Sequence, residues 1–276
     1  MAESNFTLTA PDGHPLLGRA WLPEQPKAVI CLIHGLGEHA GRYGHVAAMF
    51  NDAGYAVLAY DQRGHGQAPG PRGHIPSWDA LLNDVGLLLA EAARRYPGLP
   101  CFLYGHSMGG NIVLRYTMDR RPALAGVVAT SPAIGLSKRP WLQQALGKIM
   151  YRVKPDFMLA NGLELAGLSR DPAVVAAYEA DPLVYGRISA RLGLDLLDSM
   201  AWVAAHPDQF PAVPLLLVHG TADRLTSAAA TEAFAGQVKG DVTLKLWPGL
   251  YHETHNEPEK AEVLRFTIEW LDAHLA

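Results

Sequence analysis

Cysteine and charge are both scarce in this chain. Only two cysteines, Cys31 and Cys101, occur among its 276 residues. Both lie inside apolar runs, which favours buried free thiols over a disulfide scaffold. Charged residues make up 18% of the chain, and the formal net charge is −4. Nucleic-acid binders usually carry a basic stripe or a high isoelectric point, so we expect no nucleic-acid partner.

Targeting signals and long apolar runs are also missing from the sequence. The segment 1–5 has neither a basic nor an apolar region, so we expect no signal peptide. No apolar run approaches the roughly 20 residues that a membrane-spanning helix requires. These two features lead us to expect a cytoplasmic protein.

Hydrophobic residues make up 49% of the chain and follow two patterns. Short, continuously apolar runs are typical of strands buried on both faces. Apolar residues three or four positions apart, as in 78–96 and 258–275, are typical of amphipathic helices. Their alternation predicts an α/β domain with a mostly parallel sheet. The predicted strands are an opening hairpin of 6–9 and 17–22, followed by 28–33, 55–60, 101–104, 125–129, 213–218 and 242–246.

The alternation stops between about Pro132 and Pro211. Helical pieces are predicted at 141–152, 172–180 and 188–205, with proline and glycine between them. No run in this stretch is typical of a buried strand. We therefore predict an all-helical insertion, residues 133–211, on a core formed by residues 1–132 and 212–276.

The segment Gly105-His106-Ser107-Met108-Gly109 joins a predicted strand to a predicted helix. In this context the pattern G-x-S-x-G places a serine nucleophile on a strained turn. The glycines are needed because side chains there would collide with the neighbouring strand and helix. The alternative is an incidental serine in a glycine-rich turn, but the candidate partners described next favour a nucleophile.

Acyl transfer also requires two hydrogen-bond donors for the oxyanion of the tetrahedral intermediate. We expect one to be the N–H of Met108, directly after the serine, and the other the N–H of Leu36. Leu36 follows a predicted strand and lies between Gly35 and Gly37, which would let the backbone approach closely. The alternative is an ordinary strand–helix loop.

An acid and a base are expected after two later strands. Asp223 lies just past a predicted strand, at the sheet edge where sites form in open α/β folds. It is predicted to hold the base, although an Asx turn or a helix cap is the alternative. Asp208 and Asp241 are poorer candidates, because each precedes a strand. Of the two histidines after the last strand, His252 is preferred over His255 because it is nearer the strand end.

Four segments together resemble the monoacylglycerol lipase and lysophospholipase branch of the α/β-hydrolases. They are His34-Gly35-Leu36-Gly37-Glu38-His39-x-x-Arg42-Tyr43, Asp61-Gln62-Arg63-Gly64-His65-Gly66, Gly105-His106-Ser107-Met108-Gly109-Gly110 and Tyr251-His252. The resemblance covers nearly the whole chain and is weakest in the insertion. It implies the α/β-hydrolase fold, a cap over the active site at residues 133–211 and an apolar tunnel for an acyl chain. It also implies that Leu36 and Met108 are the oxyanion donors.

The resemblance implies roles for further polar residues. Glu38, Arg42 and His255 match groups that meet the alcohol end of the substrate. Glu38 and Arg42 could equally form a buried ion pair that braces the oxyanion loop. Asp61 and His65 are expected to brace a turn. No metal-binding cluster is visible in the sequence, and the mechanism requires no cofactor.

The predicted activity is hydrolysis of monoacylglycerol or another single-chain lipid ester through an acyl-enzyme. A short- or medium-chain carboxylesterase, a thioesterase or an amidase would use the same residues. A non-catalytic relative that binds a small ligand is the alternative from another class. Apolar residues of the insertion favour a lipid substrate and transient contact with a membrane or micelle, although they would also suit a plain core. They are Trp141, Leu142, Leu146, Ile149, Met150, Phe157, Met158 and Leu159.

Overall fold

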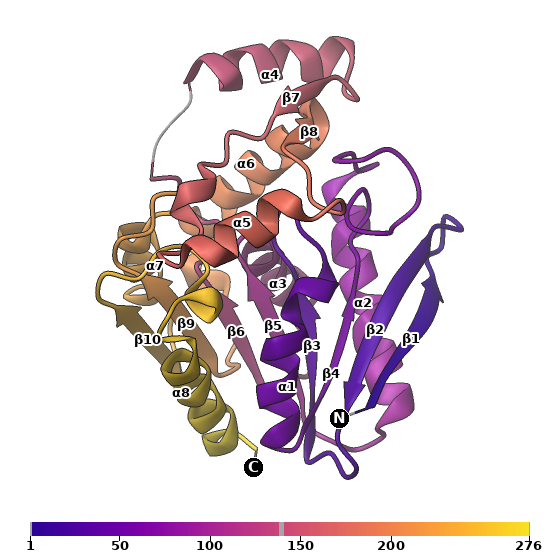
Figure 1. The fold of residues 1–276 in the computed structure, drawn as a ribbon, viewed down its shortest axis with the longest axis vertical. Helices are drawn as coiled ribbons and strands as arrows, with labels where there is room; N and C mark the ends of the chain where they lie inside the picture. The colour runs from indigo at the N-terminus through magenta and orange to yellow at the C-terminus, as the bar shows by residue number, and fades with distance from the viewer. Residues whose placement is uncertain (1, 138–140, 276) are drawn as a thin grey trace.

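A computed structural model describes residues 2–137 and 141–275, with side chains from residue 147 onward in the second range. Its centre is an eight-stranded sheet of order β1-β2-β4-β3-β5-β6-β9-β10 (Figure 1). β1 (Ala2–Thr9) and β2 (Pro15–Leu22) form an antiparallel hairpin. The other strands run parallel, as predicted. They are β3 (Ala28–Ile33), β4 (Tyr55–Tyr60), β5 (Cys101–His106), β6 (Gly126–Thr130), β9 (Leu215–Gly220) and β10 (Val242–Trp247).

Helices cover both faces of this sheet. Every residue of β3, β4, β6 and β9 is therefore buried, which explains their continuously apolar sequences. On one face pack α1 (Gly44–Asp52) and α8 (Lys260–Ala273), which lie in front of the sheet in Figure 1. On the other face pack α2 (Trp78–Arg95), α3 (Met108–Arg120) and α7 (Ala228–Ala235).

The helix α2 illustrates how the sequence produces these layers. The Ser77 hydroxyl accepts a hydrogen bond from the N–H of Ala80 at 3.2 Å and caps the helix. Leu81, Val85 and Leu88 lie along one side of the helix and are buried against the sheet. Burial of one such side chain contributes about 1.5–3 kcal/mol, so the stripe fixes the helix on the sheet.

The segment between β6 and β9 lies above the sheet in Figure 1. It contains the predicted helices, α4 (Trp141–Val153), α5 (Pro172–Ala180) and α6 (Ala190–Ala205). It also contains two strands, β7 (Met158–Ala160) and β8 (Arg187–Ser189), which pair antiparallel. The prediction of an all-helical insertion is corrected here. Strands of three residues are too short to show a period in the sequence.

Short 3-10 helices complete the chain at four places. They are η1 (Ala40–Tyr43), η2 (Leu165–Gly167), η3 (Pro207–Gln209) and η4 (Thr254–Asn256). Cys31 and Cys101 are free thiols on neighbouring strands, and their Sγ atoms lie 3.9 Å apart. Among the described residues, no helix is both long enough and apolar enough to cross a bilayer. The cytoplasmic location stays a prediction.

Candidate active site

Ser107 occupies a strained turn between β5 and α3. Its φ and ψ angles are 55° and −116°, a conformation that costs a non-glycine residue about 1–3 kcal/mol. Neighbouring backbone groups hold it there. The Ser107 N–H donates to the carbonyl of Thr130 at 3.0 Å, and its carbonyl accepts from the N–H of Ala133 at 2.9 Å. This sharp turn is the strand–turn–helix elbow that the sequence predicted.

The glycines on either side of the serine leave no room for a side chain. A Cβ atom on Gly105 would lie 2.3 Å from the carbonyl oxygen of Gly109. A Cβ atom on Gly109 would lie 2.1 Å from the carbonyl oxygen of Ile33. Both contacts are with backbone, which cannot rotate away. The two glycines therefore let α3 begin directly against β5 and β3.

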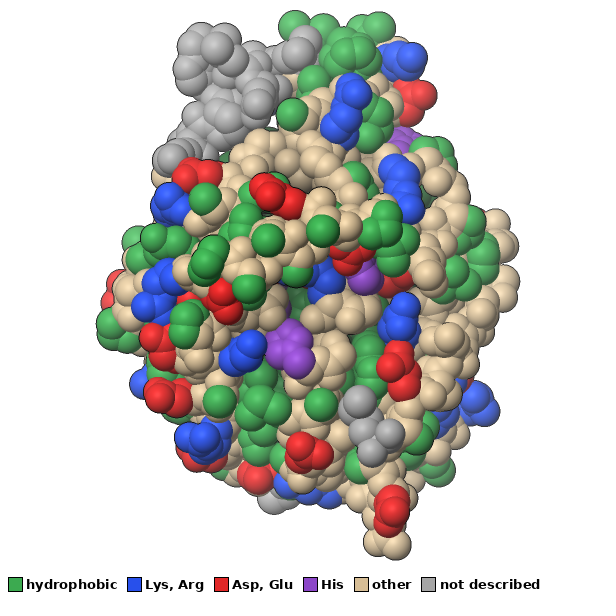
Figure 2. Space-filling model, viewed as in Figure 1, with side chains coloured by type: hydrophobic (Ala, Val, Ile, Leu, Met, Phe, Trp, Pro, Cys, Tyr) green, Lys and Arg blue, Asp and Glu red, His purple; other side chains and the backbone are tan. Residues whose placement is uncertain are grey.

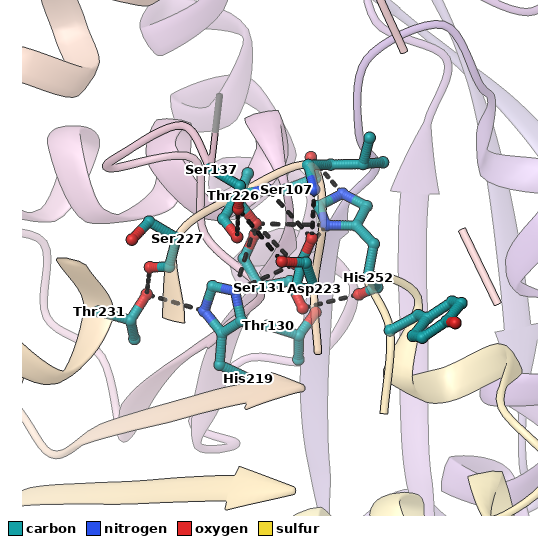
Figure 3. Close-up of polar contacts among 12 residues, drawn as sticks. Ser107, Thr130, Ser131, Ser137, His219, Asp223, Thr226, Ser227, Thr231 and His252 are labelled. Carbon is teal, nitrogen blue, oxygen red and sulfur yellow. Dashed lines mark hydrogen bonds and ion pairs between the residues drawn. The ribbon is translucent and has the colours of Figure 1, made fainter. Parts of the chain in front are cut away.

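Loops after β9 and β10 bring an aspartate and a histidine to this turn (Figure 3). His252 Nε2 lies 2.9 Å from the Ser107 hydroxyl, and His252 Nδ1 lies 2.7 Å from Asp223 Oδ2. The three side chains thus form one continuous hydrogen-bonded row at the carboxyl edge of the sheet. Asp208 lies in η3, and Asp241 precedes β10 and pairs with His274 at 3.1 Å.

The surroundings of Asp223 favour its charged form. Asp223 Oδ1 accepts hydrogen bonds from the N–H groups of Leu225 at 2.7 Å and Thr226 at 3.0 Å. Burial alone would raise the pKa of Asp223, but the neighbouring His252 and His219 hold it well below its usual range. Burial likewise disfavours the imidazolium of His252, and the Asp223 carboxylate outweighs it. The pKa of His252 is therefore raised.

Leu36 and Met108, the two predicted oxyanion donors, lie beside the serine. Met108 is the first residue of α3, where N–H groups have no acceptor within the helix. Leu36 lies in the loop after β3, and both residues line a cavity together with Ser107. Gly37, with φ of 74°, turns this loop. Its own Cβ position is closed, because it lies 2.9 Å from the carbonyl oxygen of Tyr185.

A buried ionic network supports the loop that carries Leu36. Glu38 accepts from the N–H of Gly35 at 2.6 Å and from the Tyr43 hydroxyl at 2.8 Å. Arg42 donates to Glu38 at 2.7 Å and to both carboxylate oxygens of Glu253 at 2.7 and 2.8 Å. Burial raises the pKa of Glu38. The pKa of Glu253 falls to about 2, because Arg42 outweighs the effect of burial. These contacts fit the bracing role of Glu38 and Arg42.

His255, His65 and Asp61 of the sequence motifs are buried. His255 stacks on Tyr43 at a ring separation of 5.0 Å, and its Nδ1 atom has no partner among the described residues. Burial lowers the pKa of His255 and of His65 to about 3. Asp61 accepts from the N–H groups of Ala40 at 2.9 Å and Gln67 at 2.8 Å, so it ties two loops together.

Two cavities meet at Ser107. The larger spans about 920 Å³ when its opening to solvent is included, and residues of the insertion such as Leu159, Ile188 and Leu197 line it together with Leu36. The smaller, about 280 Å³, is lined by polar as well as apolar residues. The polar ones include Glu38, His106, Tyr178, His252 and Glu253. One side of the serine is therefore apolar and the other side is mixed.

The insertion is fastened to the loops on both sides of the serine. The Tyr178 hydroxyl donates to the carbonyl of Gly37 at 3.1 Å, next to Leu36. On the other side, the N–H of Glu253 donates to the carbonyl of Leu168 at 2.8 Å. The N–H of His252 donates to the carbonyl of Gly167 at 3.3 Å. All three contacts come from the segment 161–189, which runs from the end of β7 to the end of β8. This segment thus bonds to both loops.

Sequence reasoning missed several of these neighbours. His219, Thr226 and Glu253 contact the aspartate, the histidine or the arginine of the site, and none was singled out. His219 had a detectable signal, because a His-Gly pair ends β9 and a second His-Gly pair directly follows β3, before Leu36. In the described part of the chain, no group of three or more His, Cys, Asp or Glu is placed to hold a metal ion.

Comparisons with known proteins agree with this architecture. The family model described as serine aminopeptidase, S33, matches residues 24–259. A monoacylglycerol lipase of Mycolicibacterium smegmatis is 40% identical over 99% of this chain and 98% of its own length. The crystal structure of a monoacylglycerol lipase of Paleococcus ferrophilus superposes with a TM-score of 0.86 at 37% identity. That superposition covers 94% of this chain and 99% of the other.

A further relative is much longer than this chain. An abhydrolase domain-containing protein of Dictyostelium discoideum is 38% identical over 98% of the chain, which spans only 29% of that protein. The chain belongs to the serine aminopeptidase S33 family and has the α/β-hydrolase fold. It is a serine hydrolase that acts on esters.

Replacement of Gly109 by alanine should destabilise the fold and abolish activity. The new Cβ atom would meet the backbone of β3, and overpacking of this kind costs about 1–3 kcal/mol or more. Gly44→Ala is the matched control, because Gly44 has helical φ and ψ angles and nothing lies within 4 Å of its Cβ position. Urea denaturation should show a lower midpoint for Gly109→Ala alone. Equal midpoints for the two variants would contradict the prediction.

Proposed function

We propose that this chain hydrolyses single-chain lipid esters, monoacylglycerols foremost, through an acyl-enzyme on Ser107. The observation that carries the proposal is the cavity with a mostly apolar lining, which reaches the serine and would hold an acyl chain. The two monoacylglycerol lipases described above support the same substrate class by their similarity over nearly the full chain.

The contacts at the turn suggest a role for each residue. His252 would take the proton of Ser107 as the serine oxygen attacks the ester carbonyl. Asp223 would hold the imidazole in the required tautomer and stabilise the imidazolium. The N–H groups of Leu36 and Met108 would bind the oxyanion. His252 would then protonate the leaving alcohol, and water would cleave the acyl-enzyme by the same steps.

The smaller cavity would receive the alcohol. Its lining includes the Glu38 carboxylate, the His106 ring and the Tyr178 hydroxyl, which suit a polyol better than a second acyl chain. Arg42 and His255 are not among the described residues that line it, so any effect they have on the alcohol would pass through Glu38 or Tyr43. Residues 133–211 would act as a cap on the core formed by 1–132 and 212–276, because they supply much of the acyl cavity wall.

A chain-length series tests the substrate class. With p-nitrophenyl esters, kcat/KM should rise from acetate to decanoate, because a longer acyl chain buries more surface in the apolar cavity. 1-Monodecanoylglycerol should be hydrolysed at a rate comparable to that of p-nitrophenyl decanoate. Ser107→Ala should lose essentially all activity and should not react with a fluorophosphonate probe.

Two results would count against this proposal. A clear preference for acetate would favour a short-chain carboxylesterase of the same fold. Equal labelling of wild type and Ser107→Ala by the fluorophosphonate would remove Ser107 from the reaction. Circular dichroism of Ser107→Ala should match that of the wild type, because the substitution removes only one oxygen atom.

The pH dependence of kcat/KM should follow the protonation of His252. The base must be neutral to accept a proton, and the pKa of His252 is raised above the 6.5 of a free imidazole. The rate should therefore fall as the pH drops through a midpoint above 6.5, and about tenfold per unit below it. Asp223→Asn should move this midpoint to lower pH and lower kcat greatly, since the carboxylate that stabilises the imidazolium is gone. A rate that is constant down to pH 5 would contradict the assignment.

The cap also carries a surface that suits a membrane or micelle. Ile149, Val153 and Phe157 have exposed fractions of 62%, 76% and 36%, and they lie on or just after α4. Lys148, Arg152 and Lys154, close to them in the sequence, are exposed as well. Figure 2 shows hydrophobic and Lys or Arg side chains together at the top of the molecule. Of the residues named from the sequence, Leu159 lines the acyl cavity. The side chains of Trp141, Leu142 and Leu146 lie outside the described residues.

We therefore propose that this end of the cap contacts the lipid surface from which the substrate is taken. A triple variant that combines Ile149→Gln, Val153→Gln and Phe157→Gln should bind vesicles of phosphatidylcholine and phosphatidylglycerol at least tenfold more weakly. Each CH₂ group that no longer enters the lipid removes about 0.8 kcal/mol of binding free energy. Its hydrolysis of soluble p-nitrophenyl butyrate should stay within twofold of wild type. Unchanged vesicle binding would contradict the proposal.

A further inference from the structure

Asp223 contacts two imidazoles rather than one. His252 Nδ1 lies 2.7 Å from its Oδ2 atom, and His219 Nε2 lies 3.0 Å from the same oxygen (Figure 3). His219 is completely buried at the end of β9, four residues before the aspartate. The mechanism described above gives this second histidine no task.

The proton of His219 can be placed from its two neighbours. Its Nε2 atom faces a carboxylate and must carry hydrogen, since a lone pair there would be repelled. In a neutral imidazole the other nitrogen is then an acceptor. His219 Nδ1 lies 2.8 Å from the hydroxyl of Thr231 on α7, which is itself fully buried and can donate to it. Thr231 thus fixes the tautomer in which His219 donates to Asp223.

The Thr226 hydroxyl is a further donor to this carboxylate oxygen, but it has a second acceptor within reach. The Thr226 hydroxyl lies 2.8 Å from Asp223 Oδ2, but it also lies 3.1 Å from the carbonyl of Ser131. A hydroxyl has one proton, so it can donate fully to only one of the two acceptors. The two backbone donors, from Leu225 and Thr226, bind Oδ1 instead. His219 therefore supplies the N–H group that complements His252 at Oδ2.

We propose that His219 is a positioning residue for the reaction: by donating to Asp223 Oδ2 it holds the carboxylate toward His252 and takes up part of its negative charge. This inference rests on the function proposed above. Hydrogen bonds to charged groups are stronger than neutral ones and fix direction. Without this one, the carboxylate would be held less firmly beside His252, and the negative charge that His219 no longer shares would act on the imidazolium of His252.

The alternative is a buried histidine that only fills space. His219 is not among the described residues that line the cavities beside Ser107, so its replacement should not change the contacts of the substrate directly. Two substitutions can therefore distinguish the two roles. His219→Leu keeps an apolar volume but has no N–H group. His219→Gln keeps an N–H group at similar reach from the backbone. A space-filling role predicts no advantage of glutamine over leucine.

His219→Leu should lower kcat by about tenfold to hundredfold with KM within about twofold of wild type, using p-nitrophenyl decanoate. The acidic midpoint of kcat/KM should move to higher pH. The charge of Asp223 is then no longer shared with His219, so it stabilises the imidazolium of His252 more strongly. Besides Asp223, the groups that face His252 are Glu38, His106, Glu253 and His255, with Arg42 between the glutamates, and the substitution changes none of them. His219→Gln should recover most of kcat and the wild-type midpoint.

Thr231→Val provides a second measurement if His219→Leu does not fold. It removes the hydroxyl that donates to His219 Nδ1 with almost no change of volume. Like His219→Leu it should lower kcat, but only by a few fold. The inference is overturned if folded His219→Leu keeps wild-type kcat and midpoint. It is overturned as well if both His219 variants lose the same activity, and melt at a lower temperature, without a shift of the midpoint. Loss of ester hydrolysis in Ser107→Ala tests the proposed function separately, since it does not depend on His219.

Discussion

The contact between Asp223 and His252 is the interaction on which the rest of the site depends. A carboxylate can remain charged in a buried position only if donors satisfy its oxygens. Here the turn after β9 supplies two N–H groups to Oδ1, and histidines approach Oδ2. The charge that this turn stabilises raises the pKa of His252 against the effect of its own burial. The loop that holds the aspartate therefore raises the pKa of the histidine more than any other neighbour does.

A second constraint is that the loops after β3, β9 and β10, which carry Leu36, Asp223 and His252, must keep their places at one edge of the sheet. The parallel strands fix where each loop begins, and contacts between loops fix where each one ends. Arg42 joins the Leu36 loop to the His252 loop through Glu38 and Glu253. The insertion bonds to both loops from above, through Tyr178 and Leu168. Any movement of the segment 161–189 would therefore act on the loop of Leu36 and on the loop of His252 together.

Local constraints explain which features could be predicted from the sequence. The elbow at Ser107 is encoded within five residues, since backbone contacts exclude side chains at Gly105 and Gly109. Asp223 and His252 could be proposed because each follows a strand pattern at the active edge. The pairing of β7 with β8 could not, because three residues show no period. The contact of Glu253 with Arg42 spans 211 residues and depends on the fold, so no local pattern could indicate it.

Reactivity and substrate choice therefore lie on different parts of the chain. The serine, its proposed base and the proposed oxyanion donors lie in loops of the sheet or at the start of α3, where spacing and glycine positions are tightly constrained. The wall of the larger cavity instead comes in large part from β7, β8 and α6, through residues such as Leu159, Ile188 and Leu197. Apolar wall residues can exchange for one another at small cost when volume is kept. Acyl preference can consequently change through the insertion while the chemistry proposed at Ser107 stays the same, which is why sequence motifs indicate the reaction better than the substrate.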